Sequence, residues 1–391
     1  MKMVASERIQ ELTGYAFSVI DEKVAELKRR GIAPVDFGVG DPHEPPFPSV
    51  VRRTKEALDE NLASGYPSYI GAAQFRREVS EYYRRVYGVP LDPETEVVSS
   101  LGSKEMIFNF HEAFVDPGDT VIVPNPAYPP YIRGTRFAEG KCFFVNLLES
   151  NRFVPDLDSI PKQVWQAAKL IWVCYPNNPT TVFAPDSFYE KLVRLAREYE
   201  VIIGSDEAYV ENYYGQRPRS ILEFTREGVV SFQSFSKMAN MTMFRVGFVA
   251  GDSRIVSQVK KLKTNIDSGT PTFVQLGALA ALTDTEALAG MRAGYRAKLE
   301  VLRSALRGRG FPEGYSDGTI YLWQKAPSGM DGMALAQRFL APDLGLVVTP
   351  GGMLSREVDG VNPGKDFVRF ALTPTLEEVT EAARRLERAA F

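Results

Sequence analysis

The chain has 391 residues, of which 44% are hydrophobic and 24% are charged, and its formal net charge is -3. This composition is ordinary for a folded globular protein and excludes the collagen-like and disordered classes. Lysine and arginine are spread along the chain rather than gathered into a basic stripe, so the sequence argues against nucleic acid as a partner.

Short apolar runs alternate with amphipathic helical patterns through the middle of the chain. This alternation is typical of parallel strands joined by crossover helices. The runs are apolar nearly throughout, as expected when helices cover both faces of a sheet. The predicted strands cover residues 95–101, 119–125, 169–175, 200–206, 229–235 and 245–251, and the helical patterns between them include residues 104–115, 187–199 and 254–266.

The C-terminal part has a different pattern. A long amphipathic helix is predicted over residues 290–310, followed by strands over 318–326 and 365–372 with a helix and a Gly-Pro-rich loop, 348–353, between them. We expect an α+β domain here, completed by the N-terminal segment. The predicted division is a large domain over 48–287 and a smaller domain built from 1–47 and 288–391.

The cysteine content and the hydropathy of the chain indicate the cellular compartment in which the protein is expected. The chain has two cysteines, Cys142 and Cys174, both inside apolar stretches. A disulfide framework is therefore not expected, a reducing cytoplasm is favoured, and neither cysteine has the spacing of a metal site. The N-terminus lacks an apolar signal region, and no apolar stretch reaches the roughly 18 residues of a membrane span, so a protein outside the membrane is expected.

Polar residues gather just after the apolar part of five predicted strands. In open α/β sheets, ligands bind outside the carboxyl ends of the strands, so these residues should meet at one site. They lie at 102–104, 125–128, 175–180, 206–209 and 234–237.

The first of these groups, Gly102, Ser103 and Lys104, is a small polar turn that leads into a helix. A helix N-terminus can hold a phosphate through its free N–H groups, although Ser103 alone would more simply be a helix cap. Ser234 and Ser236, with Arg245 downstream, add donors suited to a phosphate dianion.

Two further residues have an ordinary and a chemical interpretation. Asp206, at a strand end, could be a structural ion pair or a loop cap, because a buried carboxylate needs a cation or good donors. Lys237 could be a solvated turn residue, but a lysine enclosed at a strand end can have a lowered pKa and act as a nucleophile. Phosphate donors, a lysine amine and a lone carboxylate are together the parts that pyridoxal phosphate requires.

The motifs in this order resemble those of the class I and II aminotransferases, in the aspartate-aminotransferase superfamily of fold type I pyridoxal-phosphate enzymes. The resemblance covers nearly the whole chain. It rests on YPSYIGAAQFRREV, LGSKE, PNPAYPPY, YPNNPT, SDEAY, SFSK and FRVGF. It implies a large domain with a mostly parallel seven-stranded sheet between helices, plus a smaller α+β domain.

The resemblance also implies roles for the cofactor-binding residues. Lys237 resembles the lysine that bonds to the cofactor and moves the substrate proton, and Asp206 the partner of the ring nitrogen. Tyr209 and Asn178 resemble the residues that bond the ring oxygen, and Tyr128 the aromatic residue that stacks on the ring. The residues that resemble the phosphate-binding group are Gly102, Ser103, Lys104, Ser234, Ser236 and Arg245.

Arg369 resembles the arginine that binds the substrate α-carboxylate, assisted by the backbone of Gly40 and by Asn178. Arginine suits this role because its fork of donors matches a carboxylate. Tyr66 resembles a tyrosine that reaches the cofactor phosphate of a neighbouring subunit. A homodimer with shared active sites is therefore implied, with small-molecule substrates, an amino acid and a 2-oxo acid.

The sequence departs from the family motifs at two positions. Thr181 stands where the family has a glycine after Asn-Pro-Thr, and Met243 stands where it has the glycine before the phosphate arginine. Either change could reshape the pocket. They bear on substrate identity more than on cofactor binding, because Asn178 and Arg245 are retained.

Among subfamilies, the chain is most similar to the LL-diaminopimelate aminotransferases, on LDPETEVVSSLGSKE, VPDLDSIP, YPNNPT and KTNIDSG. This similarity implies a role in lysine biosynthesis. Relatives that act on alanine, aspartate or aromatic amino acids share much of the pattern. A standard aspartate enzyme is disfavoured because the segment 263–272 contains no arginine, and Lys263 is its one cation.

Other classes remain as alternatives. A C–S or β-lyase, or an acyl-transferring synthase, can use the same lysine and aspartate. A cofactor-sensing regulator would need an added DNA-binding domain, for which the chain has no basic N-terminal extension. A nicotinamide-dependent dehydrogenase lacks support because the glycine fingerprint is absent.

Overall fold

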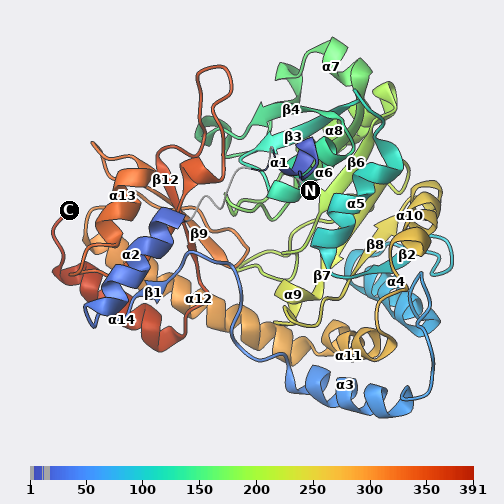
Figure 1. Ribbon diagram of the computed structural model, residues 1–391, viewed down its shortest axis with the longest axis horizontal. Helices are drawn as coiled ribbons and strands as arrows, with labels where there is room; N and C mark the ends of the chain where they lie inside the picture. The colour runs from blue at the N-terminus through green and yellow to red at the C-terminus, as the bar shows by residue number, and fades with distance from the viewer. Residues whose placement is uncertain (1–3, 11, 13–17) are drawn as a thin grey trace.

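The computed structural model describes residues 4–10, 12 and 18–391, which form an α/β protein with three sheets (Figure 1). The largest sheet has seven strands in the order β2-β8-β7-β6-β5-β3-β4. Neighbouring strands are parallel except where β8 is involved. The mostly parallel seven-stranded sheet is therefore confirmed. Its strands are β2 (Val97–Ser100), β3 (Thr120–Asn125), β4 (Lys141–Asn146), β5 (Ala168–Cys174), β6 (Ile202–Asp206), β7 (Val229–Ser234) and β8 (Gly247–Gly251).

Two strands differ from the sequence-based prediction. β4 lies at the sheet edge and is mostly half-buried, so its sequence, KCFFVN, lacks the long apolar run by which the other strands were predicted. β8 was predicted among the parallel strands but runs antiparallel to both β2 and β7. The segment between β7 and β8 holds only a four-residue helix, α9 (Phe235–Met238), whereas a parallel crossover usually contains a full helix.

The large sheet is covered on both faces, as the apolar strands predicted. Val121 and Val123 of β3 face one apolar cluster, while Ile122 between them belongs to the other. Helices α5 (Ser103–Phe114), α6 (Pro129–Phe137) and α10 (Ser253–Ile266) contribute to the first cluster, and α4 (Ala73–Tyr87), α8 (Asp186–Tyr199) and α11 (Thr272–Thr283) to the second. α3 (Pro48–Glu60) packs outside α11, and α7 (Lys162–Ala167) precedes β5.

The C-terminal part carries a smaller, antiparallel sheet in the order β11-β12-β9. The long helix α12 (Thr285–Gly308) leads into it from α11 (Figure 1). The remaining elements are β9 (Tyr321–Lys325), α13 (Gly332–Phe339), β10 (Leu346–Val347), β11 (Thr349–Pro350), β12 (Phe367–Ala371), α14 (Leu376–Arg388) and the short 3-10 helices η1 (Glu149–Asn151), η2 (Leu157–Ser159), η3 (Ile221–Glu223) and η4 (Gly351–Met353).

The N-terminal segment contacts this C-terminal part of the chain. It contains α1 (Glu7–Gln10), α2 (Ser18–Arg29) and β1 (Val35–Asp36), and β1 pairs in parallel with β10. The backbone N–H of Ala371 in β12 also donates to the carbonyl of Phe37. The exact division into 48–287 and 1–47 with 288–391 stays a prediction. None of the helices in the described ranges is both long and apolar enough to cross a membrane.

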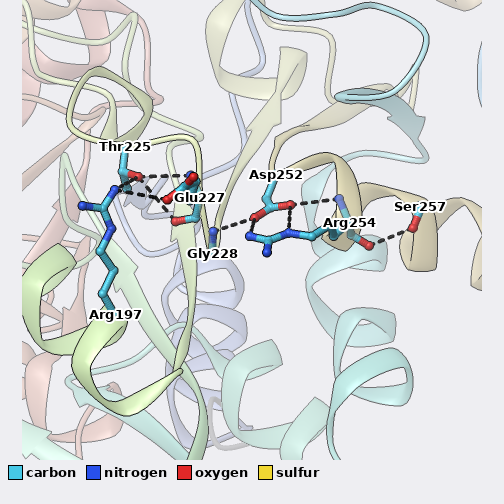
Figure 2. A network of polar contacts seen from close by, with 7 residues as sticks. All are labelled: Arg197, Thr225, Glu227, Gly228, Asp252, Arg254 and Ser257. Carbon is cyan, nitrogen blue, oxygen red and sulfur yellow. Dashed lines mark hydrogen bonds and ion pairs between the residues drawn. The ribbon is translucent and has the colours of Figure 1, made fainter.

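A polar network lies at the amino end of β7, on the side of the large sheet away from the carboxyl ends of its parallel strands (Figure 2). Asp252 accepts from the backbone N–H groups of Gly228, at 2.7 Å, and Arg254, at 2.9 Å, and so caps α10 and holds the turn before β7. Arg197, in the last turn of α8, donates to the hydroxyl of Thr225 at 3.0 Å. These contacts tie two helices to the start of β7, and they explain the network as structural.

Candidate active site

A cavity of about 710 Å³ lies where the carboxyl ends of β5, β6 and β7 meet the smaller part of the chain. Residues predicted for the site come together here from segments far apart in the sequence. Those that line the cavity are Gly40, Ser103, Lys104, Tyr128, Asn178, Asp206, Tyr209, Ser234, Ser236, Lys237, Arg245 and Arg369.

Arg245 lines the cavity and lies against Gly102, which is not part of the cavity lining. Gly102 is the N-cap of α5 with a φ of 77°, and a Cβ there would lie 2.5 Å from Arg245 Nη2, so only glycine allows the guanidinium to approach. Arg245 donates from Nη1 to the hydroxyl of Ser236 at 3.3 Å. No side chain caps α5, so Ser103 does not act as a conventional cap and the first N–H groups of the helix are left for another acceptor.

Ser234 shapes the adjacent turn. It is the N-cap of α9, and its hydroxyl accepts from the backbone N–H of Ser236 at 3.2 Å. The turn presents Lys237 to the cavity, where its Nζ donates to the carbonyl of Gly40 at 2.5 Å. Burial lowers the pKa of Lys237, while the nearby Tyr321 and Asp41 act in the opposite direction.

Asp206 ends β6 and is buried beneath the cavity. Its carboxylate accepts from the hydroxyl of Tyr131 at 2.7 Å and from the backbone N–H of Ala208 at 3.3 Å. Burial raises the pKa of Asp206 to about 6, although both hydrogen bonds favour the charged form. Among the residues that the structure describes, no cation pairs with it.

Tyr131 was missed as a functional residue by the sequence analysis, although it is the last residue of PNPAYPPY. Its ring stacks on Trp172 with centroids 4.9 Å apart, which directs the hydroxyl to Asp206. The indole N–H of Trp172 in turn donates to His111 Nε2 at 3.0 Å. Burial lowers the pKa of His111 to about 4, so this histidine is neutral and able to accept.

Arg369 enters from β12 and faces the cavity. Its Nη1 donates to Asn178 Oδ1 at 2.9 Å and its Nη2 to the carbonyl of Gly38 at 3.1 Å. Its Nε has no hydrogen-bond partner within the described part of the chain. A buried fork with free donors is suited to a carboxylate ligand.

A tyrosine pair lies beside this arginine. Tyr209 Oη is 3.1 Å from Tyr321 Oη, and Asn178 Nδ2 donates to Tyr209 Oη at 3.5 Å. Burial raises the pKa of Tyr209 well above its usual value, so the phenol keeps its proton. Tyr321 lines the cavity but was not predicted, because it occurs within an apolar strand where a tyrosine is usually a core residue.

The two predicted aromatic residues outside this pair have different environments. Tyr128 is the N-cap of α6 and lines the cavity, where burial raises its pKa. Tyr66 lies outside the cavity of its own protomer and is 84% exposed. The structure therefore brings together all the predicted residues except Tyr66, with Gly102 directly behind Arg245.

The two departures from the family motifs fall in different places. Thr181 is fully buried at a φ of 68°, a backbone conformation that favours glycine, and it does not line the cavity. Met243 lines the cavity and is 82% exposed, so it contributes to the cavity rim.

Lys263 does not face the cavity. Its side chain is 0% exposed, and its Nζ pairs with Asp267 Oδ2 at 2.6 Å. This pairing leaves the segment 263–272 without a free cation in the protomer described here, because Lys263 was its one predicted candidate.

Comparisons with known proteins identify the family of the chain. The family description "Aminotransferase class I and II" matches residues 33–386. The LL-diaminopimelate aminotransferase of Aquifex aeolicus (strain VF5) is 42% identical over 386 residues, which cover 98% of each chain.

Solved structures give the same result. Apo-BacF from Bacillus subtilis has a TM-score of 0.91 at 29% identity, covering 99% of this chain and 98% of its own. A single mutant of Thermus thermophilus aspartate aminotransferase has a TM-score of 0.87 at 28% identity, covering 99% of this chain and 100% of its own. With the fold, the cavity and the whole-length match in agreement, the chain belongs to the class I and II aminotransferases.

Proposed function

We propose that this aminotransferase binds pyridoxal 5′-phosphate in the cavity and exchanges an amino group between an amino acid and a 2-oxo acid by ping-pong chemistry. The observation that carries the proposal is the charge arrangement around one cavity. A lysine amine, Lys237, lies there with the buried carboxylate of Asp206, and the two are flanked by the guanidinium groups of Arg245 and Arg369.

The phosphate would be held at the end formed by Arg245. The uncapped N–H groups of α5, the bare Cα of Gly102 and the hydroxyls of Ser234 and Ser236 leave a space surrounded by donors. Such a donor set fits a dianion.

The ring would be held between Tyr128 and the floor of the cavity. Asp206 fits a cationic ring nitrogen, because its buried charge has donors but lacks a cationic partner among the described residues. Tyr209 and Asn178 fit the ring oxygen as donors, and Lys237 would bond to the cofactor covalently.

When bound, the cofactor supplies an electron sink for the charge that develops at the substrate α-carbon. Lys237 Nζ would be freed when the amino group of the substrate takes its place on the cofactor. The free amine would then take the α-proton as general base and return it as general acid, and its burial assists by increasing the neutral fraction of the amine. Arg369 binds the α-carboxylate through the N–H donors that Asn178 and Gly38 leave free. This contact fixes the α-carbon relative to Lys237.

LL-diaminopimelate with 2-oxoglutarate is the substrate pair that we propose. The relative from Aquifex aeolicus bears that donor's name and matches over nearly the full length of both chains. The far end of this donor carries an ammonium and a carboxylate. Asp41 and Lys104, one charge of each sign, both line the cavity, which suits such an end.

We also propose a homodimer in which Tyr66 reaches the phosphate of the partner's site. Tyr66 is exposed and lies outside its own cavity. Leu62, Met243 and Ile266 are further exposed apolar residues. Gly269 packs against the backbone of Ser68, so the segments that carry Leu62 and Ile266 adjoin. A cytoplasmic location is consistent with the free Cys142 and Cys174.

An absorbance spectrum of the purified protein with added pyridoxal phosphate tests the function. We expect a visible band that LL-diaminopimelate or glutamate converts to the shorter-wavelength aminated form, and that 2-oxoglutarate restores. The donor with the fastest conversion identifies the substrate, with alanine, aspartate and aromatic amino acids as the competing candidates.

The Lys237→Ala variant is the control. It should keep phosphate-anchored cofactor but lose turnover, because it lacks the amine proposed to move the α-proton. Transamination by this variant at the wild-type rate would contradict the assignment of Lys237. Release of pyruvate and ammonia, without restoration by a 2-oxo acid, would instead identify a β-lyase.

A further inference from the structure

Tyr321 lies where the two parts of the chain meet in the cavity. It is the first residue of β9 in the smaller sheet and is 3% exposed. Its hydroxyl oxygen is 3.1 Å from that of Tyr209, which follows β6 of the large sheet, and the two rings meet edge to face at 63°. Tyr321 therefore contacts a proposed cofactor-binding residue from the opposite side of the cavity.

The ring of Tyr321 also supports Arg369. The guanidinium carbon lies 4.3 Å from the ring centroid, within the range of a cation–π contact. The other contacts of this guanidinium in the described structure are single hydrogen bonds to Asn178 and Gly38. The aromatic face consequently fixes the plane of the fork, which determines how a carboxylate can bind.

The hydroxyl of Tyr321 has little freedom. A Cβ on Gly40 would lie 2.0 Å from it, so the oxygen rests directly on the bare backbone of Gly40. Gly40 is also the residue whose carbonyl accepts from Lys237 Nζ. One tyrosine thus adjoins three residues of the proposed site.

The direction of the tyrosine–tyrosine hydrogen bond follows from the proposed role of Tyr209. A phenol has one hydrogen, so Tyr209 can donate to a ligand in the cavity only when Tyr321 donates to Tyr209. The alternative donor to Tyr209, Asn178 Nδ2, is at the longer distance of 3.5 Å. A donated hydrogen bond also makes Tyr209 a stronger donor in turn.

We propose that Tyr321 is a positioning residue with two separable roles: its hydroxyl directs the Tyr209 proton into the cavity, and its ring orients Arg369 for the substrate carboxylate. This inference rests on the function proposed above for Tyr209 and Arg369. It adds a residue of the smaller sheet that contacts both Tyr209, on the proposed cofactor side of the cavity, and Arg369, on the proposed substrate side.

Two substitutions separate the roles. Tyr321→Phe removes the hydroxyl and keeps the ring, whereas Tyr321→Leu removes both. Tyr214→Phe is the matched control, because the Tyr214 hydroxyl donates to the carbonyl of Thr319 at 2.7 Å, close to Tyr321 but away from the cavity lining. A general effect of losing a tyrosine hydroxyl near β9 would appear in this control.

The first measurement is the pH titration of the visible band of each cofactor-loaded protein without substrate. A weaker donor to an anionic ring oxygen favours the protonated chromophore, so the midpoint for Tyr321→Phe should rise by about half a pH unit. The midpoint for Tyr214→Phe should equal that of the wild type. A Tyr321→Phe titration that coincides with the wild type overturns the inference, whether or not Tyr321→Leu folds.

The second measurement is calorimetric binding of glutarate, a dicarboxylate with neither an amino nor an oxo group. Tyr321→Leu should bind it roughly tenfold more weakly than the wild type, and Tyr321→Phe within about twofold. Equal affinity in all three proteins overturns the role of the ring. If the wild type itself has no visible band and no transferase activity, the proposed function fails instead, so the two failures are distinguishable.

Discussion

Asp206 carries a buried carboxylate, and the burial of its charge is unfavourable for the stability of the cofactor-free protein. Its carboxylate is buried, and burial raises its pKa from 3.8 to about 6 despite two hydrogen bonds. A carboxyl group whose pKa is higher in the folded state than in the unfolded state stabilises the fold below its unfolded-state pKa. This stabilisation is lost as the pH rises through the folded-state pKa. The cofactor-free protein should therefore lose stability as the pH rises from about 4 to about 6. A cation bound beside Asp206 should offset this loss.

Asp206→Asn tests this reasoning. The amide oxygen can accept from the Ala208 N–H, while the amide NH2 donates to the Tyr131 hydroxyl, which reverses the direction of that hydrogen bond. Because the amide carries no charge, at pH 8 the cofactor-free variant should be more stable than the wild type by about 3 kcal/mol. The difference should vanish near pH 4, where the wild-type carboxyl is protonated. Urea unfolding of both proteins at the two pH values measures it, and equal stability at pH 8 would show that the charge is compensated.

The sequence motifs predicted the residues whose chemistry is distinctive, and the missed residues act through contacts between distant segments. Asp206 ends β6, and Lys237 lies in the short helix α9 directly after β7, so each follows an apolar run in the sequence. Tyr131 and Tyr321 are aromatic residues in apolar surroundings, and their importance depends on partners in other elements, such as Asp206 for Tyr131. The pairing of Lys263 with Asp267 could have been predicted, because Lys263 is in the last turn of α10 and Asp267, the C-cap, follows it by four residues.

At the scale of elements, the close packing of α5 against α6 positions the cavity residues. Tyr128 caps α6 and Tyr131 lies in its first turn, so any movement of α6 moves both. Gly134 permits the approach, since a Cβ there would lie 2.2 Å from His111 Nδ1 and 2.8 Å from the carbonyl of Phe108 in α5.

Gly134→Ala should therefore destabilise the protein by about 1–3 kcal/mol, because the added methyl group overpacks the helix interface. Gly294→Ala is the matched control, since Gly294 is exposed in α12 and a Cβ there would have nothing within 4 Å. The control should stabilise the protein by about 0.5–1 kcal/mol, because alanine is the better helix former. Denaturant unfolding measures both changes. Equal effects of the two substitutions would mean that α6 can shift without cost.

The strands show why element prediction succeeds in the centre of the sheet and fails at its margins. β5 and β7 are buried nearly throughout, so their apolar runs were unambiguous. The edge strand β4 is half-buried and has no such run. The antiparallel direction of β8 depends on the connection after β7, which an apolar pattern does not encode.

At the scale of the whole molecule, the site lies where the large sheet meets the smaller sheet. The large sheet provides Asp206 and Lys237, and the smaller part provides Arg369, Tyr321 and the backbone of Gly40. In the proposed function, cofactor chemistry and substrate recognition therefore come from different parts of the chain, and we expect that a substitution in one part changes substrate affinity while the cofactor remains bound.

The proposed dimer extends this division across two chains and can be tested with mixed variants. Lys237→Ala removes the amine of a chain's own site, and Tyr66→Ala removes the residue proposed to serve the partner's site. If Tyr66 acts in trans, a hybrid of the two variants has one site with both residues intact and one with neither. Each variant alone should be strongly impaired.

Equimolar unfolding and refolding of the two variants should then restore activity to about a quarter of the wild-type sites, because half of the dimers are hybrids with one intact site each. Refolding each variant alone is the control and should restore nothing. If Tyr66 instead acts within its own chain, every site that retains Lys237 in the hybrid lacks its tyrosine. The mixture would then be no more active than the average of the two variants, and the shared site would be wrong.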